Sequence, residues 1–366
     1  MVQPRVDLER IQPYRPGKPI EEVCRELGLK KVIKLASNEN PLGTSPKALK
    51  AMRQAIKEGF LYPDDTAYYL RKKLSEKFQI DENCIILGNG SVELIYLACL
   101  AYLNPPNDEL IVSKGSFVLA KIGSQVAGAK CIEIPLKDYR HDLERILAAI
   151  TSNTKIIYLD NPINPLGTIV YKKELDEFME KVPDNILIIL DEAYYEYILE
   201  KKYPDSFRYL RKGKNVLILR TFSKIYGLAG LRIGYGFSKP EIIQALHKVR
   251  YPFHVNRIAQ IAASAALDDQ AFVKKSIKNN EMGKKYLYKE LEKIKKVFFL
   301  ETYANFIFLN FSIDSQIIFE KLLKLGVITR TLKEYDFPNA LRVTIGTPKE
   351  NEYFIKCLNK VLEESG

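Results

Sequence analysis

The stretch Val216-Leu217-Ile218-Leu219-Arg220-Thr221-Phe222-Ser223-Lys224 decides the fold class, because an apolar run ends abruptly at hydroxyl side chains and a lysine. The run shows little polar alternation, which is typical of a strand covered on both faces of a sheet. Runs of the same kind lie at 84–87, 109–113, 130–134, 155–160, 186–191 and 233–237. Helix-length segments such as 92–102, 143–149 and 172–181 lie between them. This alternation predicts an α/β domain with a mainly parallel central sheet.

The pattern changes after Pro240, and a smaller α+β unit is predicted there. It would contain a long, interrupted helical stretch at 241–297, a helix at 316–325 and a closing helix at 350–363, with strands at 305–310, 327–330 and 341–345. Prolines at 13, 16 and 19 favour an extended arm, rather than a core element, for the first 40 or so residues. We therefore expect an arm and part of the small domain at 1–45, a large domain at 46–265 and a small domain at 266–366.

Composition excludes several classes of protein. The 366 residues carry a net charge of +11, but basic and acidic residues alternate, and the lysine-rich segment 273–297 is most simply a solvated helix face, so nucleic acid is not expected as a partner. Five cysteines without a CxxC pair favour free thiols in a reducing compartment, and three histidines without ligand spacing predict no metal site. No apolar run reaches about 18 residues and the N-terminus lacks a signal-peptide pattern, so we expect a cytoplasmic protein with no membrane partner.

Gly88-Asn89-Gly90-Ser91 follows a predicted strand and opens a predicted helix. The backbone N–H groups and the positive helix dipole at such a place suit a phosphate. A tight turn with a serine N-cap explains the same residues equally well. Glu93 occupies the position where a dinucleotide-binding fingerprint needs its third glycine, which argues against a dehydrogenase.

Three further strand ends carry candidate chemical groups. Asp191 ends a buried run and is suited to a pyridinium nitrogen, with Tyr194 three residues on, although an aspartate capping the next turn is common. Lys224 follows the run quoted first, where its amine is placed for Schiff-base chemistry with a carbonyl cofactor. Arg232, helped by the hydroxyls of Thr221 and Ser223, would clamp the phosphate of such a cofactor.

Three polar residues outside those strand ends complete the candidate set. Asn164, in a proline-rich loop, would donate to a phenolic oxygen of the cofactor. Arg342 lies in an otherwise apolar strand and is a natural receptor for a carboxylate or phosphate. Arg330, at the end of a short strand, fits the same role or a plain surface position.

The order of Asn164-Pro165, Asp191-x-x-Tyr194, Ser223-Lys224 and Arg232 resembles the fold-type I aminotransferases that depend on pyridoxal phosphate. Segments at 13–20, 36–41, 88–91, 228–232 and 339–347 resemble, more narrowly, the histidinol-phosphate aminotransferases. The likeness covers nearly the whole chain. It implies the fold-type I transferase fold, pyridoxal 5′-phosphate as cofactor, and reversible transamination of L-histidinol phosphate with 2-oxoglutarate to imidazole acetol phosphate and glutamate, in histidine biosynthesis.

The resemblance also implies a role for each matching residue. Lys224, Asp191 and Tyr194 would be catalytic. The cofactor would be held covalently by Lys224, at its ring nitrogen by Asp191, and at its phenolic oxygen by Tyr194 and Asn164. Its other contacts would be Gly90, Ser91, Val92, Thr221, Ser223 and Arg232 around the phosphate, Phe117 stacked on the ring, and Tyr62 from the other subunit of a homodimer.

The substrates, on the same resemblance, would be bound by Arg342 and Arg330, which receive the glutamate carboxylate and the histidinol phosphate, with Tyr14 and Asn164 lining the pocket. The chain departs from the family at Leu166, at Ser116 before the stacking residue, and at Val92. None of these removes a group that the chemistry needs. An aromatic amino acid aminotransferase or a decarboxylase of a phosphorylated amino acid on the same scaffold remain alternatives.

Overall fold

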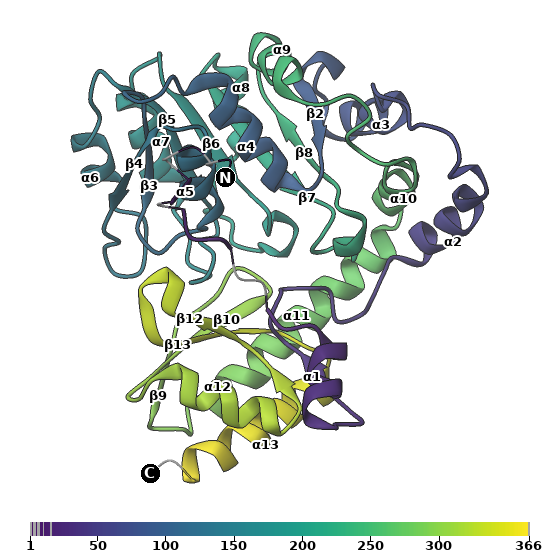
Figure 1. Ribbon diagram of the computed structural model, residues 1–366, viewed down its shortest axis with the longest axis vertical. Helices are drawn as coiled ribbons and strands as arrows, with labels where there is room; N and C mark the ends of the chain where they lie inside the picture. Colours follow the sequence, from purple (N-terminus) through teal and green to yellow (C-terminus); the bar gives the residue numbers. More distant parts are fainter. Residues whose placement is uncertain (1, 3–4, 6–7, 10, 15–16, 365–366) are drawn as a thin grey trace.

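The computed structural model describes residues 2, 5, 8–9, 11–14 and 17–364. It contains a large sheet-and-helix unit and a smaller one, and the long helix α11 (Gln270–Leu291) runs from one to the other (Figure 1). Arg15 and Pro16 belong to a segment that carries the family resemblance, and they lie outside the described residues. The same holds for residues 1, 3–4, 6–7 and 10 of the expected arm.

The large unit is built on a sheet of seven strands within the described residues. Their spatial order is β2 (Ile85–Gly88), β8 (Gly234–Phe237), β7 (Val216–Thr221), β6 (Leu187–Asp191), β5 (Thr154–Asp160), β3 (Glu109–Ser113) and β4 (Lys130–Ile134). Strand β8 runs antiparallel to both of its neighbours, and the remaining pairs are parallel. The predicted strands are confirmed to within one residue at each end.

Apolar residues alternate between two cores, one on each face of this sheet. In β6, Ile188 and Leu190 face one core, while Leu187 and Ile189 face the other. The first core is covered by α3 (Tyr68–Phe78), α6 (Leu143–Ala148), α7 (Lys172–Lys181), α8 (Ser206–Arg211) and α10 (Arg257–Leu267), against which α2 (Pro46–Ala55) packs. The second is covered by α4 (Ser91–Tyr102), α5 (Leu119–Val126) and α9 (Pro240–Val249). Burial on both faces explains the continuous apolar runs of the sequence.

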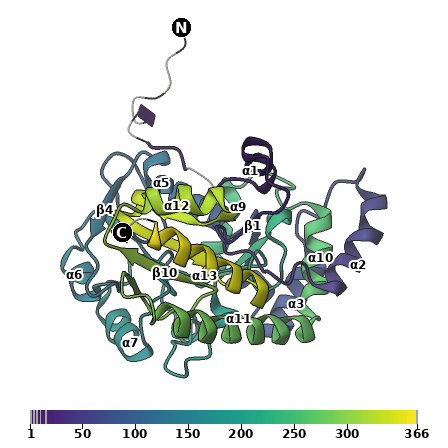
Figure 2. The same ribbon diagram turned by 90° about the horizontal axis from the view of Figure 1, so that it is seen from below.

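The small unit holds an antiparallel sheet in the order β12 (Arg330–Leu332), β13 (Phe337–Thr344), β10 (Phe306–Phe311) and β9 (Val297–Phe299). Helices α11, α12 (Ser315–Lys324) and α13 (Pro348–Glu363) pack on it, and Figure 2 shows α11 and α13 side by side. Helix α11 gives Val273 to the core of the large unit and Leu287 and Leu291 to that of the small one. Its lysines are mostly exposed, which confirms the predicted solvated face. The domain boundaries at 45/46 and 265/266 stay a proposal.

The expectation of an extended arm without core elements was wrong for residues 20–36. Helix α1 (Ile20–Leu27) starts directly after Pro19, ends at Gly28 with a left-handed φ of 65°, and buries Val23 completely. Strand β1 (Ile33–Lys34) pairs with β11 (Val327–Ile328). Proline has no N–H to donate and therefore suits a helix start, so Pro19 marks the beginning of α1 rather than a continuation of the arm.

Two smaller expectations also need correction. The single strand predicted at 327–330 is divided between two sheets, because Val327–Ile328 pairs with β1 whereas Arg330 begins β12. The helical stretch predicted to reach 297 ends at Leu291, and β9 begins at Val297. Short 3₁₀ helices lie at Ile56–Glu58, Glu82–Cys84, Tyr195–Tyr197, Ala229–Leu231 and Lys333–Tyr335.

Candidate active site

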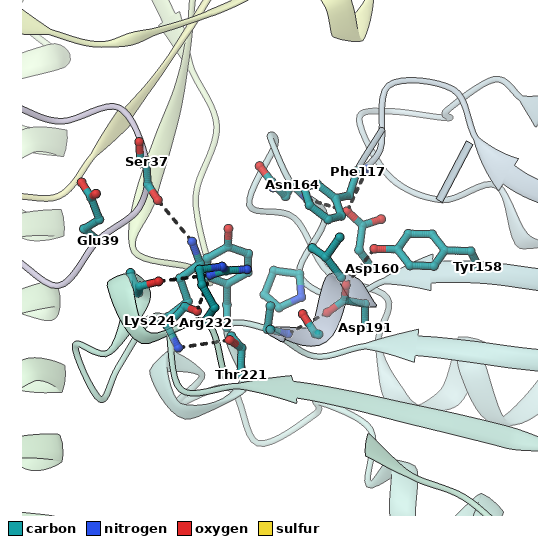
Figure 3. Close-up of a pocket in the computed structure, with 18 residues that line it drawn as sticks. Ser37, Glu39, Phe117, Tyr158, Asp160, Asn164, Asp191, Thr221, Lys224 and Arg232 are labelled. Atoms are coloured by element: carbon teal, nitrogen blue, oxygen red, sulfur yellow. Dashed lines mark hydrogen bonds between the residues drawn. The ribbon is translucent and has the colours of Figure 1, made fainter. Parts of the chain in front are cut away.

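A cavity of about 250 Å³ lies where β5, β6 and β7 end, as expected for the carboxyl edge of a parallel sheet (Figure 3). Lys224 and Arg232 lie on one side of it, and Asn164, Asp160 and Tyr158 on the other. Eleven residues predicted from the sequence line this cavity: Gly90, Ser91, Val92, Phe117, Asn164, Asp191, Tyr194, Thr221, Ser223, Lys224 and Arg232. The structure thus brings together segments that are far apart in the chain.

Lys224 lies three residues beyond the end of β7 and points its amine into the cavity. Its Nζ donates to the backbone oxygen of Ser37 at 3.2 Å and lies 5.6 Å from the centre of the Tyr194 ring. Burial, aided by the nearby charge of Arg342, lowers the pKa of this amine to about 7. A large fraction of Lys224 is therefore unprotonated and nucleophilic near neutral pH.

Asp191 ends β6 and is 5% exposed. Its Oδ2 accepts a hydrogen bond from Tyr158 Oη at 2.9 Å, and its Oδ1 accepts one from Ala193 N at 3.2 Å. The carboxylate thus caps the following turn, as one interpretation of the sequence had it, and also faces the cavity, as the other requires. Burial and the charge of Asp160 raise the pKa of Asp191 to about 7, which favours a cationic group beside it.

Two side chains tie the cavity to the small unit and to the N-terminal segment. Tyr194 is buried, and its hydroxyl accepts a hydrogen bond from Asn38 Nδ2 at 2.9 Å. Burial raises the pKa of Tyr194 to about 12, so it stays protonated and can donate. Asn164 Oδ1 accepts from Arg342 Nη1 at 2.5 Å.

The turn between β2 and α4 has the geometry of a cradle for an anion. Gly90 is the N-cap of α4, not Ser91 as one interpretation of the sequence had it, and its φ is 74°. Arg232 donates to Ser223 Oγ and to Asn89 O, each at 3.4 Å, so its guanidinium lies across the start of the helix. The first N–H groups of a helix have no partner within the helix, and together with the guanidinium they suit a phosphate.

Asp160, which the sequence interpretation did not single out, ends β5 directly beside Asp191 in the sheet register. Its Oδ2 accepts from Asn164 N at 2.8 Å and from Phe117 N at 3.2 Å. His141 Nε2 lies 3.5 Å from its Oδ1. One buried carboxylate therefore holds two of the loops that line the cavity.

Four predicted residues, Tyr14, Tyr62, Arg330 and Arg342, are not among those that line the cavity. Tyr62 is 79% exposed and stacks on Phe253 with 4.8 Å between ring centres. Arg330 pairs with Glu334, and its guanidinium lies 5.4 Å from the centre of the Tyr14 ring. Arg330 is only 7% exposed, so the plain surface position considered for it is excluded, and in the sheet it lies directly opposite Arg342.

Some residues that line the cavity were not predicted, because the sequence marks them only weakly. Tyr158 and Asp160 stand two apart at the end of an apolar strand, and such residues share a face of the sheet. Ser37 and Glu39 also line the cavity, and they lie in one of the segments that carry the family resemblance, although no role was assigned to them. No cluster of three or more possible metal ligands occurs among the described residues, and no helix there is long and apolar enough to cross a membrane.

The donor set fits pyridoxal phosphate. A Cβ added at Gly90 would lie 2.5 Å from Arg232 Nη2, so only glycine leaves the cradle open for a phosphate. The two hydrogen bonds that Asp191 accepts come from a tyrosine hydroxyl and a backbone N–H, neither of them a cation, so its carboxylate can accept a protonated ring nitrogen. Lys224 supplies the amine that an aldehyde needs, and Tyr194 supplies a hydroxyl for the phenolic oxygen.

Comparison with known proteins gives consistent relatives. The family described as aminotransferase class I and II matches residues 30–358. The chain is 49% identical over 353 residues to a histidinol-phosphate aminotransferase from Moorella thermoacetica, covering 96% of this chain and 91% of that protein. It is 45% identical over 355 residues to one from Caldicellulosiruptor saccharolyticus, covering 97% and 99%. The crystal structure of histidinol-phosphate aminotransferase from Sinorhizobium meliloti in complex with pyridoxal-5′-phosphate is similar over 100% of this chain and 99% of that one, with a TM-score of 0.90 and 26% identity.

Proposed function

The chain belongs to the aminotransferase class I and II family, and we propose that it transfers the amino group of L-histidinol phosphate to 2-oxoglutarate, reversibly, in histidine biosynthesis. It is a pyridoxal-phosphate-dependent transaminase with the fold-type I architecture. The observation that carries the proposal is the placement of Lys224 and Asp191 in one cavity with the cradle of Gly90 and Arg232. Relatives that share 41–49% identity over nearly the whole chain bear the name of this reaction.

Pyridoxal phosphate, when bound, supplies an aldehyde that takes up the amino group and a ring that withdraws electrons from the reacting carbon. Lys224 Nζ would hold that aldehyde, and Asp191 would keep a proton on the ring nitrogen. Tyr194 and Asn164 would bind the phenolic oxygen, and Phe117 would stack on the ring. Gly90, Ser91, Val92, Thr221, Ser223 and Arg232 would surround the phosphate.

Lys224 is also the proposed general base. The pKa of Lys224 is about 7, so the free amine can take the proton from the substrate carbon that bears the nitrogen. For the same reason it can give that proton up again in a later step without a large energetic cost. Asp191 would stabilise the positive charge of the protonated ring nitrogen, which strengthens the electron withdrawal that the reaction needs. The tyrosine hydroxyl of Tyr194 stays protonated and orients the phenolic oxygen.

The two substrates are both anionic, and two arginines lie next to the cavity to receive them. Arg342 is 6% exposed and donates to Asn164 in the cavity wall, and Arg330 lies across from it on β12. A planar guanidinium binds carboxylate and phosphate alike, so one pair can serve a dicarboxylate and a phosphate ester in turn. Tyr14, beside Arg330, would complete this wall.

The proposed assembly is a homodimer in the cytoplasm. Large apolar side chains gather on and near the segment that carries Tyr62, with Phe60 83%, Ile56 66% and Tyr69 78% exposed. Contiguous apolar exposure of this kind marks a protein interface, and it supports the expectation that Tyr62 reaches the cofactor of a second subunit. The free cysteines, of which Cys99 and Cys357 are buried, support a reducing compartment.

The test is a single half-reaction. The purified protein is loaded with pyridoxal phosphate and mixed with L-histidinol phosphate, phenylalanine or tyrosine, while the visible absorbance of the bound cofactor is followed. Fast loss of that absorbance with histidinol phosphate and slow loss with the aromatic amino acids is the expected result. Faster conversion of the aromatic amino acids would assign the protein to aromatic transamination instead.

The control is Lys224→Ala, which is expected to show neither the visible absorbance band nor conversion of any donor. A wild-type protein that binds no cofactor would contradict the transaminase itself. Release of carbon dioxide from a phosphorylated amino acid, without amino transfer, would favour the decarboxylase alternative.

A further inference from the structure

Asp160 is a buried carboxylate that the proposed reaction does not use. It is 3% exposed, ends β5, and lies beside Asp191 in the sheet. Its Oδ2 accepts the backbone N–H groups of Phe117 and Asn164, whereas its buried Oδ1 has no hydrogen-bond partner among the described residues. A buried carboxylate oxygen without a partner is costly, so a reason for keeping it is expected.

The two backbone contacts link Asp160 to the cofactor site from two sides. Phe117 precedes α5 and is expected to stack on the cofactor ring, and Asn164 is expected to bind its phenolic oxygen. Because both N–H groups donate to the same oxygen atom, the two loops are fixed relative to each other and to the end of β5. Asn164 is held from its other end by Arg342.

The titratable groups that face Asp160 give it no full counter-charge. On β6, Asp191 carries the same charge, and the charge of Asp160 disfavours ionisation of Asp191. His141, from the segment before α6, presents Nε2 to the backbone oxygen of Asp160 at 2.9 Å and lies 3.5 Å from its Oδ1. The other ring nitrogen of His141 lies 2.6 Å from Ser113 Oγ. The remaining neighbours, Tyr158 and Tyr194, have pKa values raised by burial and stay neutral.

A third carboxylate nearby behaves differently. Glu192 follows Asp191, and its Oε2 accepts two hydrogen bonds from Arg220, at 2.8 and 3.0 Å. That charge is compensated within the protein. Asp160 and Asp191 therefore form a pair of like charges. His141 lies beside Asp160, whereas Asp191 has no ion pair among the described residues and shares the cavity with the amine of Lys224, so the counter-charge that Asp191 lacks lies on the cavity side.

We propose that Asp160 is a positioning residue for the cofactor, which fixes the loops of Phe117 and Asn164 through one oxygen and adds a second negative charge behind Asp191. This inference rests on the proposed function, because the missing counter-charge is the protonated ring nitrogen of pyridoxal phosphate. Asp191 would contact that nitrogen, and Asp160 would act through Asp191. Two charges hold the proton on the ring more firmly than one.

Two variants separate the two parts of this role. Asp160→Asn keeps an oxygen for the two N–H groups and removes the charge, whereas Asp160→Ala removes both. Glu109→Gln is the matched control, because Glu109 is also a buried carboxylate. It is the first residue of β3, at the edge of the sheet opposite to the cavity, and it accepts a hydrogen bond from Thr151. For each protein, the dissociation constant of pyridoxal phosphate is measured by absorbance titration from pH 5 to pH 9, with thermal unfolding as a check of folding.

Asp160→Asn is expected to bind the cofactor about tenfold more weakly than wild type at pH 8, and Asp160→Ala about a hundredfold more weakly, because it also loses two hydrogen bonds. The acid limb of the binding profile should move to lower pH in both, since removal of a neighbouring negative charge lowers the pKa of Asp191. A purely structural role would weaken binding without moving that limb. Glu109→Gln should match wild type in both measurements.

Wild-type affinity and an unmoved acid limb in Asp160→Asn would overturn the proposal, and so would equal affinities for the Asn and Ala variants, since the loop contacts would then contribute nothing. If Asp160→Ala does not fold, the isosteric Asn variant still decides the question of charge. Failure of the proposed function looks different, because wild type and Glu109→Gln would then lack the cofactor band or convert no donor.

Discussion

The amine of Lys224 shows how strongly a side chain depends on its surroundings. Its pKa falls from 10.5 to about 7 through burial and through the charge of Arg342. Because only the unprotonated amine attacks an aldehyde, the rate at which the empty protein captures pyridoxal phosphate should rise with pH up to about 7 and level off above it. Rapid mixing over pH 5 to 10, followed by visible absorbance, measures this rate.

The Arg342 charge provides the control for that measurement. In Arg342→Met the positive neighbour is gone, so the pKa of Lys224 and the midpoint of the rate profile should both move upward. A wild-type capture rate that still rises steeply between pH 8 and pH 10 would mean that Lys224 keeps the pKa of an exposed lysine.

Tyr158 is expected to influence Asp191, at the other end of the proposed cofactor site. Its hydroxyl donates to Asp191 Oδ2 at 2.9 Å and so favours the ionised carboxylate. In Tyr158→Phe the pKa of Asp191 should rise, and the acid limb of cofactor binding should move to higher pH by about one unit, the size expected when a charged group loses a hydrogen bond. This shift is opposite in direction to the one expected for Asp160→Asn.

A second buried tyrosine serves as the matched control. Tyr209 donates to Asp176 Oδ1, also at 2.9 Å, but away from the cavity. Tyr209→Phe should leave cofactor binding unchanged at every pH. Equal profiles for wild type and Tyr158→Phe would show that the Tyr158 hydrogen bond does not influence Asp191.

Helix α4 contributes to the site through its first turn, and Gly90 is the residue that makes this turn open. Gly90→Ala would force a Cβ to within 2.5 Å of the Arg232 guanidinium at a φ of 74°. We expect cofactor affinity to fall by at least about tenfold, because the cradle is then filled and Arg232 displaced. Absorbance titration at fixed pH measures the affinity.

Backbone strain alone is tested by Gly213→Ala. Gly213 has a φ of 76°, but a Cβ there would meet nothing within 4 Å. This variant pays a similar conformational cost without touching the cradle, so it should lose some stability and keep its affinity for pyridoxal phosphate. A loss of affinity in Gly213→Ala as large as in Gly90→Ala would refute the steric argument.

Most elements of the large unit were predictable, because burial on both faces leaves an unmistakable signal. The run 109–113 contains no alternation, and β3 coincides with it. Helix α1 was hidden because the prolines before it dominate the local composition, although Pro19 stands at its N-cap. The strand at 327–330 was divided because register and sheet membership depend on long-range partners such as Ile33, which local sequence does not reveal.

The site was predictable where a residue type is unusual for its element and hidden where it is not. Lys224 and Asp191 break apolar runs and were found at once. Tyr158 was missed because a tyrosine inside a strand is ordinary. Its hydroxyl contacts Asp191 on the neighbouring strand β6, a contact that the local sequence does not reveal. The pairing of Arg330 with Arg342 depends on how β12 meets β13, which no spacing along the chain encodes.

The cavity depends on the whole molecule, because both units and the N-terminal segment contribute to it. Asn38 donates to Tyr194 of the large unit, and Thr344 of β13 in turn donates to Asn38. Arg342 of the small unit reaches Asn164 of the large one. A movement between the units would therefore alter cofactor and substrate contacts together, which suits a site that must exchange two different anions.

The second subunit is the last component of the proposed site, and hybrid dimers can test it. Tyr62 is 79% exposed, is not among the residues that line the cavity of its own chain, and lies within the exposed apolar segment. If Tyr62 serves the cofactor of the partner subunit, Lys224→Ala and Tyr62→Ala homodimers should both be impaired. A hybrid with one variant in each chain then has one site with an intact Lys224 and an intact Tyr62, so activity should return to about half that of wild type.

The hybrid is prepared by unfolding and refolding a mixture of the two variants that carry different affinity tags, followed by isolation of doubly tagged dimers. Tyr69→Ala, another exposed tyrosine at 78%, replaces Tyr62→Ala in the control; its homodimer should be active, and its hybrid with Lys224→Ala should also reach about half. A hybrid of Lys224→Ala and Tyr62→Ala that stays as impaired as the Tyr62→Ala homodimer, measured per intact Lys224, would place Tyr62 in its own subunit's site. Doubly tagged species that never form would argue against the dimer itself, because two exposed apolar segments that do not associate cannot complete each other's cavities.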